Sequence, residues 1–183
     1  MKPTVVVLII LAAGVLFVAR PRFQRWRMQR AEVAAASAGL RLAVLNREFV
    51  DATVAGGPND VQCVLMDWNL GGQSVATLVA FEDGTTSLYL SSGGGVLGAG
   101  DHERVRHAAA DFRAAAAKVR DRFAPTDNLE RPPSGHSRFF VVTRTQTLAS
   151  PVLPNKELRQ SNSAFAELGA AAQATLTEIR RAS

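Results

Sequence analysis

The sequence predicts an α+β protein, in which an N-terminal single transmembrane helix precedes a small domain. We expect this domain to contain a mainly antiparallel four-stranded sheet, made of a three-strand meander and one further strand, with helices packed against it. Three observations predict this architecture: an uncharged apolar stretch opens the chain, three apolar runs separated by turn residues follow, and helical periodicity flanks a fourth apolar run. We divide the chain into a transmembrane anchor (1–20), a basic juxtamembrane segment and helix (21–57), and a soluble α+β domain (58–183).

The opening stretch has the composition of a membrane-spanning helix. From Pro3 to Ala19 it carries no charged residue, and as a helix it would rise about 25 Å, at the short end for a span. A cleaved signal peptide is the alternative, but no pair of small residues at cleavage spacing follows the apolar stretch. The pattern favours an uncleaved anchor in the lipid bilayer.

Arginines follow this stretch directly and set the expected topology. The candidates for contact with the membrane interface are Arg20, Arg22, Arg25, Arg27, Arg30 and Trp26. Because the side of a span that is richer in basic residues usually stays in the cytoplasm, we predict a single-pass protein of the bacterial inner membrane with a cytoplasmic domain. A periplasmic domain is the alternative.

The basic character of the chain belongs to this flank alone. Residues 1–30 hold six of the 21 Lys and Arg and no acidic residue, which leaves 15 (21 − 6) basic residues against all 16 Asp and Glu. A body that binds nucleic acid would itself carry a basic surface. We therefore exclude nucleic acid as a partner.

A helix is predicted within residues 24–55, a stretch rich in helix formers and interrupted only by Gly39. Leu42, Leu45 and Phe49 recur at spacings of three and four, which predicts that they form the buried stripe of this helix. Gly56, Gly57 and Pro58 end it.

Three apolar runs then predict an antiparallel meander over residues 61–68, 74–82 and 85–91. Asp83 and Gly84 predict a tight hairpin turn of the primed type between the last two strands. Segment 91–100, SSGGGVLGAG, is expected to be a flexible loop, and Asp101 is expected to be the N-cap of the helix after it.

Two helices and a fourth strand complete the prediction. The first helix buries the stripe Val105, Ala109, Phe112, Ala116, Val119 and Phe123. The fourth strand covers residues 139–148, after a loop over 125–137 and before Pro151 and Pro154. The last helix covers residues 163–181 and buries Phe165, Leu168, Ala172, Leu176 and Ile179.

The glycine segment provides weak candidates for a binding site. Gly93, Gly95 and Gly98 match the G-x-G-x-x-G pattern, but the preceding strand belongs to a hairpin and Asp101 would compete with a phosphate for the helix N-terminus. A Walker motif is excluded because Asp101 replaces the required lysine. We expect no cofactor and retain only contact with a partner or a small anion. The binding candidates are Gly93, Gly94, Gly95, Gly98, Gly100 and Asp101.

No motif predicts a metal site. His102, Glu103 and His107 read H-E-x-x-x-H, one residue longer than the zinc protease motif, so the two histidines would lie on different faces of a helix. Cys63 is the single cysteine, which excludes an intramolecular disulfide and a cysteine zinc site, and its apolar surroundings predict a buried thiol.

No motif predicts a catalytic residue either. Ser134, His136 and Ser137 lie together in a loop, but no acid or oxyanion hole accompanies them. Asp67, at the end of the first strand, is interpreted as a turn former.

Together the patterns predict a membrane-tethered, non-catalytic binding or assembly module that contacts the bilayer and either a protein partner or a second copy of itself. One alternative is a membrane-associated hydrolase or transferase acting through Asp67, Asp101 and His102. The other is a periplasmic envelope protein with an uncleaved signal anchor.

Overall fold

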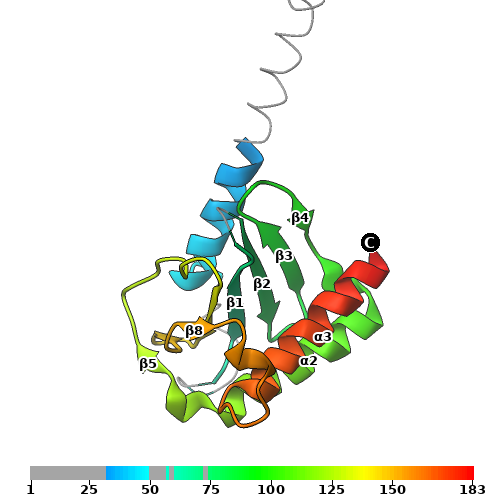
Figure 1. Ribbon diagram of the computed structural model, residues 1–183. Helices are drawn as coiled ribbons and strands as arrows, with labels where there is room; N and C mark the ends of the chain where they lie inside the picture. Colours follow the sequence, from blue (N-terminus) through cyan, green and yellow to red (C-terminus); the bar gives the residue numbers. More distant parts are fainter. Residues whose placement is uncertain (1–31, 50–56, 58–59, 72–73) are drawn as a thin grey trace, which may run out of the picture.

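The computed structural model describes residues 32–49, 57, 60–71 and 74–183, and it shows one antiparallel sheet between helices (Figure 1). The strands are β1 (Cys63–Asn69), β2 (Val75–Phe81), β3 (Thr86–Leu90), β4 (Gly95–Val96), β5 (Ala124–Pro125), β6 (His136–Val142), β7 (Thr147–Ala149) and β8 (Leu153–Pro154). The helices of the described residues are a first helix over 32–45, α2 (Glu103–Lys118), α3 (Ala166–Ala182) and the short 3-10 helices η1 (Ala99–Asp101), η2 (Arg120–Arg122) and η3 (Glu157–Arg159).

The structure is α+β, as expected, but the prediction of a four-stranded sheet is wrong. Within the described residues, eight strands form the sheet, in the order β4-β3-β2-β1-β6-β7-β5 with β8 paired to β6. The unpredicted β4, β5 and β8 contain two residues each, too few to leave a period-two pattern in the sequence.

The membrane prediction falls on a part of the chain that the structure does not describe. The predicted anchor over 1–20 and the interface residues from Arg20 to Arg30 lie outside the described residues. Among the residues that are described, no helix is both long enough and apolar enough to cross a membrane.

The predicted meander is confirmed, with β1, β2 and β3 paired in sequence. Its second turn differs from the prediction. Phe81 N donates to Thr85 O at 2.9 Å, so three residues, 82–84, connect the strands, and Gly84 adopts a φ of 89°. Because a three-residue connection needs a left-handed residue only at its last position, the glycine is required there and a two-residue primed turn is not formed.

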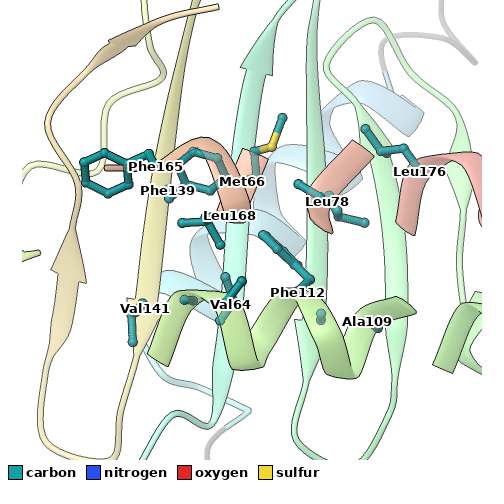
Figure 2. Close-up of a cluster of buried hydrophobic side chains, with 14 of the residues drawn as sticks. Val64, Met66, Leu78, Ala109, Phe112, Phe139, Val141, Phe165, Leu168 and Leu176 are labelled. Atoms are coloured by element: carbon teal, nitrogen blue, oxygen red, sulfur yellow. The ribbon is translucent and has the colours of Figure 1, made fainter. Parts of the chain in front are cut away.

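Both faces of the sheet are buried, each against a different helical layer. On one face Val64, Met66 and Phe139 pack against α2 and α3, with Phe112 and Leu168 at the centre (Figure 2). On the other face the alternate residues of the strands pack against the end of helix 32–45. The sequence predicts helices without placing them on particular faces, and β1 reads as a continuous apolar run because it is covered on both sides.

Helix 32–45 buries a stripe other than the predicted one. Val44 and Leu45 are buried together with Arg41, whereas Leu42 is 43% exposed. Phe49, beyond the end of the helix, is 53% exposed and contacts the Phe81 ring edge-on. Only Leu45 of the three predicted stripe residues lies in the core.

The predicted fourth strand is two strands joined by a tight turn. β6 ends at Val142, and Thr143 N donates to Gln146 O at 3.0 Å before β7 begins. Thr143 Oγ1 also donates to Gln146 O at 2.9 Å and accepts from Gln146 N. In the alternating sequence TRTQTL, residues 143–146 therefore form a turn in which the Thr143 side chain adds to the backbone hydrogen bond, and Thr147 and Leu148 belong to β7.

The two long helices are confirmed, but α2 is shorter than predicted. It buries Val105, Ala109, Phe112 and Ala116, as predicted, and ends at Lys118, so the predicted Val119 is its C-cap and Phe123 follows η2. α3 buries Leu168, Ala172, Leu176 and Ile179.

Gly100→Ala is expected to lower the free energy of unfolding by about 2 kcal/mol or more, because its Cβ would lie 2.0 Å from Gly84 O and the buried backbone has to move. Gly39→Ala, in an open position of helix 32–45, is expected to raise it by up to about 1 kcal/mol. Urea unfolding of the full chain measures both changes. Equal stability of the two variants would contradict the close packing of η1 on the β2–β3 turn.

Candidate functional site: a buried ion pair and the groove beside Trp68

A buried ion pair joins helix 32–45 to the centre of the sheet. Asp67 of β1 is 0% exposed and Arg41 is 3% exposed. Arg41 Nε donates to Asp67 Oδ2 at 2.8 Å and to Oδ1 at 3.1 Å, and Arg41 Nη2 donates to Oδ2. Thr77, directly opposite Asp67 on β2, donates its hydroxyl to Oδ1 at 2.6 Å. Both carboxylate oxygens therefore have charged or hydroxyl donors.

A second arginine lies across the sheet from the same carboxylate. Arg138 of β6 is directly opposite Asp67, and its Cζ lies 5.1 Å from the centre of the Phe140 ring, which Arg41 also approaches at 5.7 Å. Burial lowers the pKa of Arg138, and the charge of Arg41 lowers it further, while Asp67 and Glu130 act in the opposite direction. The Phe140 ring thus lies against two cations, of which Arg41 contacts Asp67 directly and Arg138 donates to Asn128 O at 3.1 Å.

The geometry gives Asp67 a structural role. Its acceptor positions are filled from Arg41 and Thr77, so it is not the turn former that the sequence suggests. It faces helix 32–45, whereas Asp101 and His102 precede α2, which packs on the other face. The three residues of the predicted hydrolase or transferase alternative are therefore not brought together.

A hydrogen-bonded network at the end of β1 fixes the segment before α3. Asn69 Nδ2 donates to Pro132 O at 3.0 Å, and Asn155 Nδ2 donates to Asn69 O at 2.9 Å. Ser137 Oγ in turn donates to Asn155 Oδ1 at 2.7 Å. These bonds hold the start of η3 beside β1 and leave an opening next to Trp68.

That opening is a groove of about 350 Å³ between β1, η3 and the first half of α3. It is open to solvent on one side. Its lining includes Trp68, Asn155, Leu158, Arg159, Gly169 and Gln173. Small residues of α3 and the Leu158 side chain form apolar walls, and the polar groups stand at the rim. No lining residue of the groove is acidic.

The predicted glycine site is a packed hairpin instead of a flexible loop. Leu90 N donates to Gly94 O at 3.0 Å, and β4 then pairs with β3. A Cβ at Gly95 would lie 2.0 Å from Leu88 O, so this glycine is required by the close approach of two strands. Gly93, Gly94 and Gly98 adopt left-handed φ values of 93°, 91° and 67°, which the turns on either side of β4 require.

Asp101 is not the N-cap of α2, contrary to the prediction. It lies in η1 with Gly100, and the N-cap position is occupied by His102 without a side-chain hydrogen bond. The Gly100 carbonyl instead accepts from Arg106 Nη1 at 2.8 Å. The six glycine-segment candidates therefore have packing roles or exposed positions, and none of these contacts identifies a ligand.

The histidines have ordinary surface contacts. His107 Nε2 lies 3.6 Å from Glu103 Oε1 with both side chains exposed, and His136 Nδ1 lies 2.9 Å from Ser134 O. Within the described residues, no three His, Cys, Asp or Glu side chains are grouped closely enough to hold a metal ion.

Comparison of the chain with models of known protein families, with curated proteins and with solved structures found no match.

Breaking the Arg41–Asp67 pair from one side is expected to destabilise the fold strongly. Asp67→Asn leaves the Arg41 charge buried without a carboxylate, and we expect a loss of about 3–5 kcal/mol in urea unfolding of the full chain. Arg41→Met should lose a similar amount, whereas the double variant Arg41→Met/Asp67→Leu should lose clearly less than the sum. Asp127→Asn, at an exposed position, is the control and should change stability by under about 0.5 kcal/mol. Additive losses in the double variant would contradict direct coupling.

Cys63 is expected to be unreactive in the folded chain. The thiol is fully buried, and burial raises its pKa above the ordinary range, which suppresses the thiolate. Ellman's reagent should label the native chain only as fast as it unfolds and should label one thiol per chain at once in denaturant. Rapid labelling without denaturant would show that this face of the sheet opens.

Proposed function

We propose that this chain is a non-catalytic binding or assembly module that contacts a protein partner or a second copy of itself. The observation that carries the proposal is a contrast between two polar regions. The oxygens of the buried Asp67 are occupied by Arg41 and Thr77. The groove beside Trp68 combines apolar walls with the Trp68 indole, the Arg159 guanidinium and the Gln173 amide, which have no side-chain partner among the described residues.

The two regions suit different roles. An acid that takes part in a reaction must reach the proton or atom on which it acts, and the side chain of Asp67 is closed off from solvent. A recognition surface needs apolar area beside polar groups that a partner can pair. The groove has this composition, and it is held by the Asn69–Asn155 network rather than by a loose loop.

The location of the module stays a prediction from residues 1–30. Their composition favours the bacterial inner membrane with the body on the cytoplasmic side, and the periplasm stays the alternative. These residues lie outside the described part of the chain, so the proposal of a binding module does not depend on them.

Photo-crosslinking in the native host tests the proposed function. The full chain carries benzoylphenylalanine at one exposed alanine at a time, Ala110 or Ala114 on α2 and Ala170 or Ala174 on α3. We expect at least one position to give a discrete adduct heavier than the chain. Monomer alone at every position would overturn the proposal.

A catalytic role predicts a different outcome of the same experiment. Asp101→Asn or His102→Ala would then reproduce the phenotype of the gene deletion while protein level and adducts stay unchanged. The binding proposal expects both variants to complement the deletion.

A further inference from the structure

The groove beside Trp68 has donors in excess of acceptors. Trp68 Nε1, the Arg159 guanidinium and the Gln173 amide make no side-chain hydrogen bond or ion pair within the described part of the chain. Indole and guanidinium groups only donate. A ligand that satisfies them must therefore present acceptors.

The electrostatics of the groove favour a negative charge. Arg159 is exposed, and no acidic side chain lines the groove. Of the two nearest acids along the chain, Glu167 pairs with Lys118 of α2, and Glu157, which is not in the lining, accepts from Ser163 Oγ at 3.5 Å. Ala166, the first residue of α3, also lies at the groove, and the amino end of a helix carries partial positive charge.

The walls of the groove are fixed before any ligand arrives. Gly169 is buried, and a Cβ there would lie 3.0 Å from Leu158 Cβ, so α3 and η3 are in close contact. Asn155 is tied to the end of β1 as described above, and Trp68 belongs to β1 itself. A preformed surface costs little ordering on binding.

We propose that this groove binds an acidic segment of a partner protein, with a carboxylate at Arg159 and Gln173 and an apolar neighbour against Trp68 and Leu158. The inference rests on the proposed function and names the partner's chemistry. A peptide segment fits better than an enclosed small molecule because the volume is at the low end for ligand pockets and one side is open. Only one or two side chains enter, and the remainder of the partner stays outside.

Selection of a random octapeptide phage library on the immobilised full chain tests this proposal without choosing a sequence in advance. We expect the selected peptides to be enriched in Asp or Glu next to an apolar residue. Arg159→Gln should weaken binding of a selected peptide about two- to fivefold, as expected for an exposed charged pair. Ala170→Glu, at an exposed position of the groove wall, should abolish it by repulsion. Arg180→Gln, at the far end of α3, is the matched control and should bind normally.

Tryptophan fluorescence provides the direct readout. The chain contains two tryptophans, so Trp26→Phe leaves Trp68 as the sole reporter. A selected peptide should shift the emission of Trp68. The same peptide with Asn and Gln in place of Asp and Glu should leave the emission unchanged. Three outcomes would each overturn the inference. They are a failure to select any peptide, selection without enrichment in acidic residues, and equal binding by the Arg159→Gln and Arg180→Gln variants. If the photo-crosslinked adducts still form in cells after Ala170→Glu, the inference about the groove is overturned, while the proposed function stays intact.

Discussion

The arrangement of the whole domain depends on the neutralisation of one buried charge. Asp67 stands in the middle of the sheet with no access to water, and a carboxylate in that environment requires a charged, hydrogen-bonding partner. Among the described residues, only Arg41 supplies the opposite charge in direct contact. Helix 32–45 therefore lies across this face at the rotation that brings Arg41 inward. That rotation buries Val44 and Leu45 and turns Leu42 to solvent.

The end of β1 connects this ion pair with the groove. Asp67, Trp68 and Asn69 are consecutive residues of one strand, so their side chains alternate between the two faces. Asp67 binds helix 32–45 on one face, while Trp68 opens on the α3 side and Asn69 fixes Asn155 beside it. A shift of β1 by one residue would exchange the two faces and lose both features. The ion pair therefore sets the strand register on which the groove depends.

The parts of the fold that were predictable are those whose evidence is local. α2 and α3 show repeated apolar spacing over several turns, and the meander shows apolar runs between turn residues. The two-residue strands have no such signal, and helix 32–45 was assigned the wrong stripe because an arginine occupies its buried side. An inward-facing charge is explained only by its partner, and Arg41 and Asp67 are 26 residues apart.

The same distinction separates the glycine segment from the groove as candidate sites. The glycines attract attention in the sequence because they form a dense local pattern, yet Gly95 and Gly100 are each required by a backbone oxygen that would lie 2.0 Å from a Cβ. Packing thus accounts for the pattern without a ligand. The groove leaves no pattern, since Trp68, Arg159 and Gln173 come from a strand, a 3-10 helix and a helix that are distant in sequence. Among the described residues, Trp68 Nε1, the Arg159 guanidinium and the Gln173 amide have no side-chain partner, so packing does not account for them and they stay free to pair with a ligand.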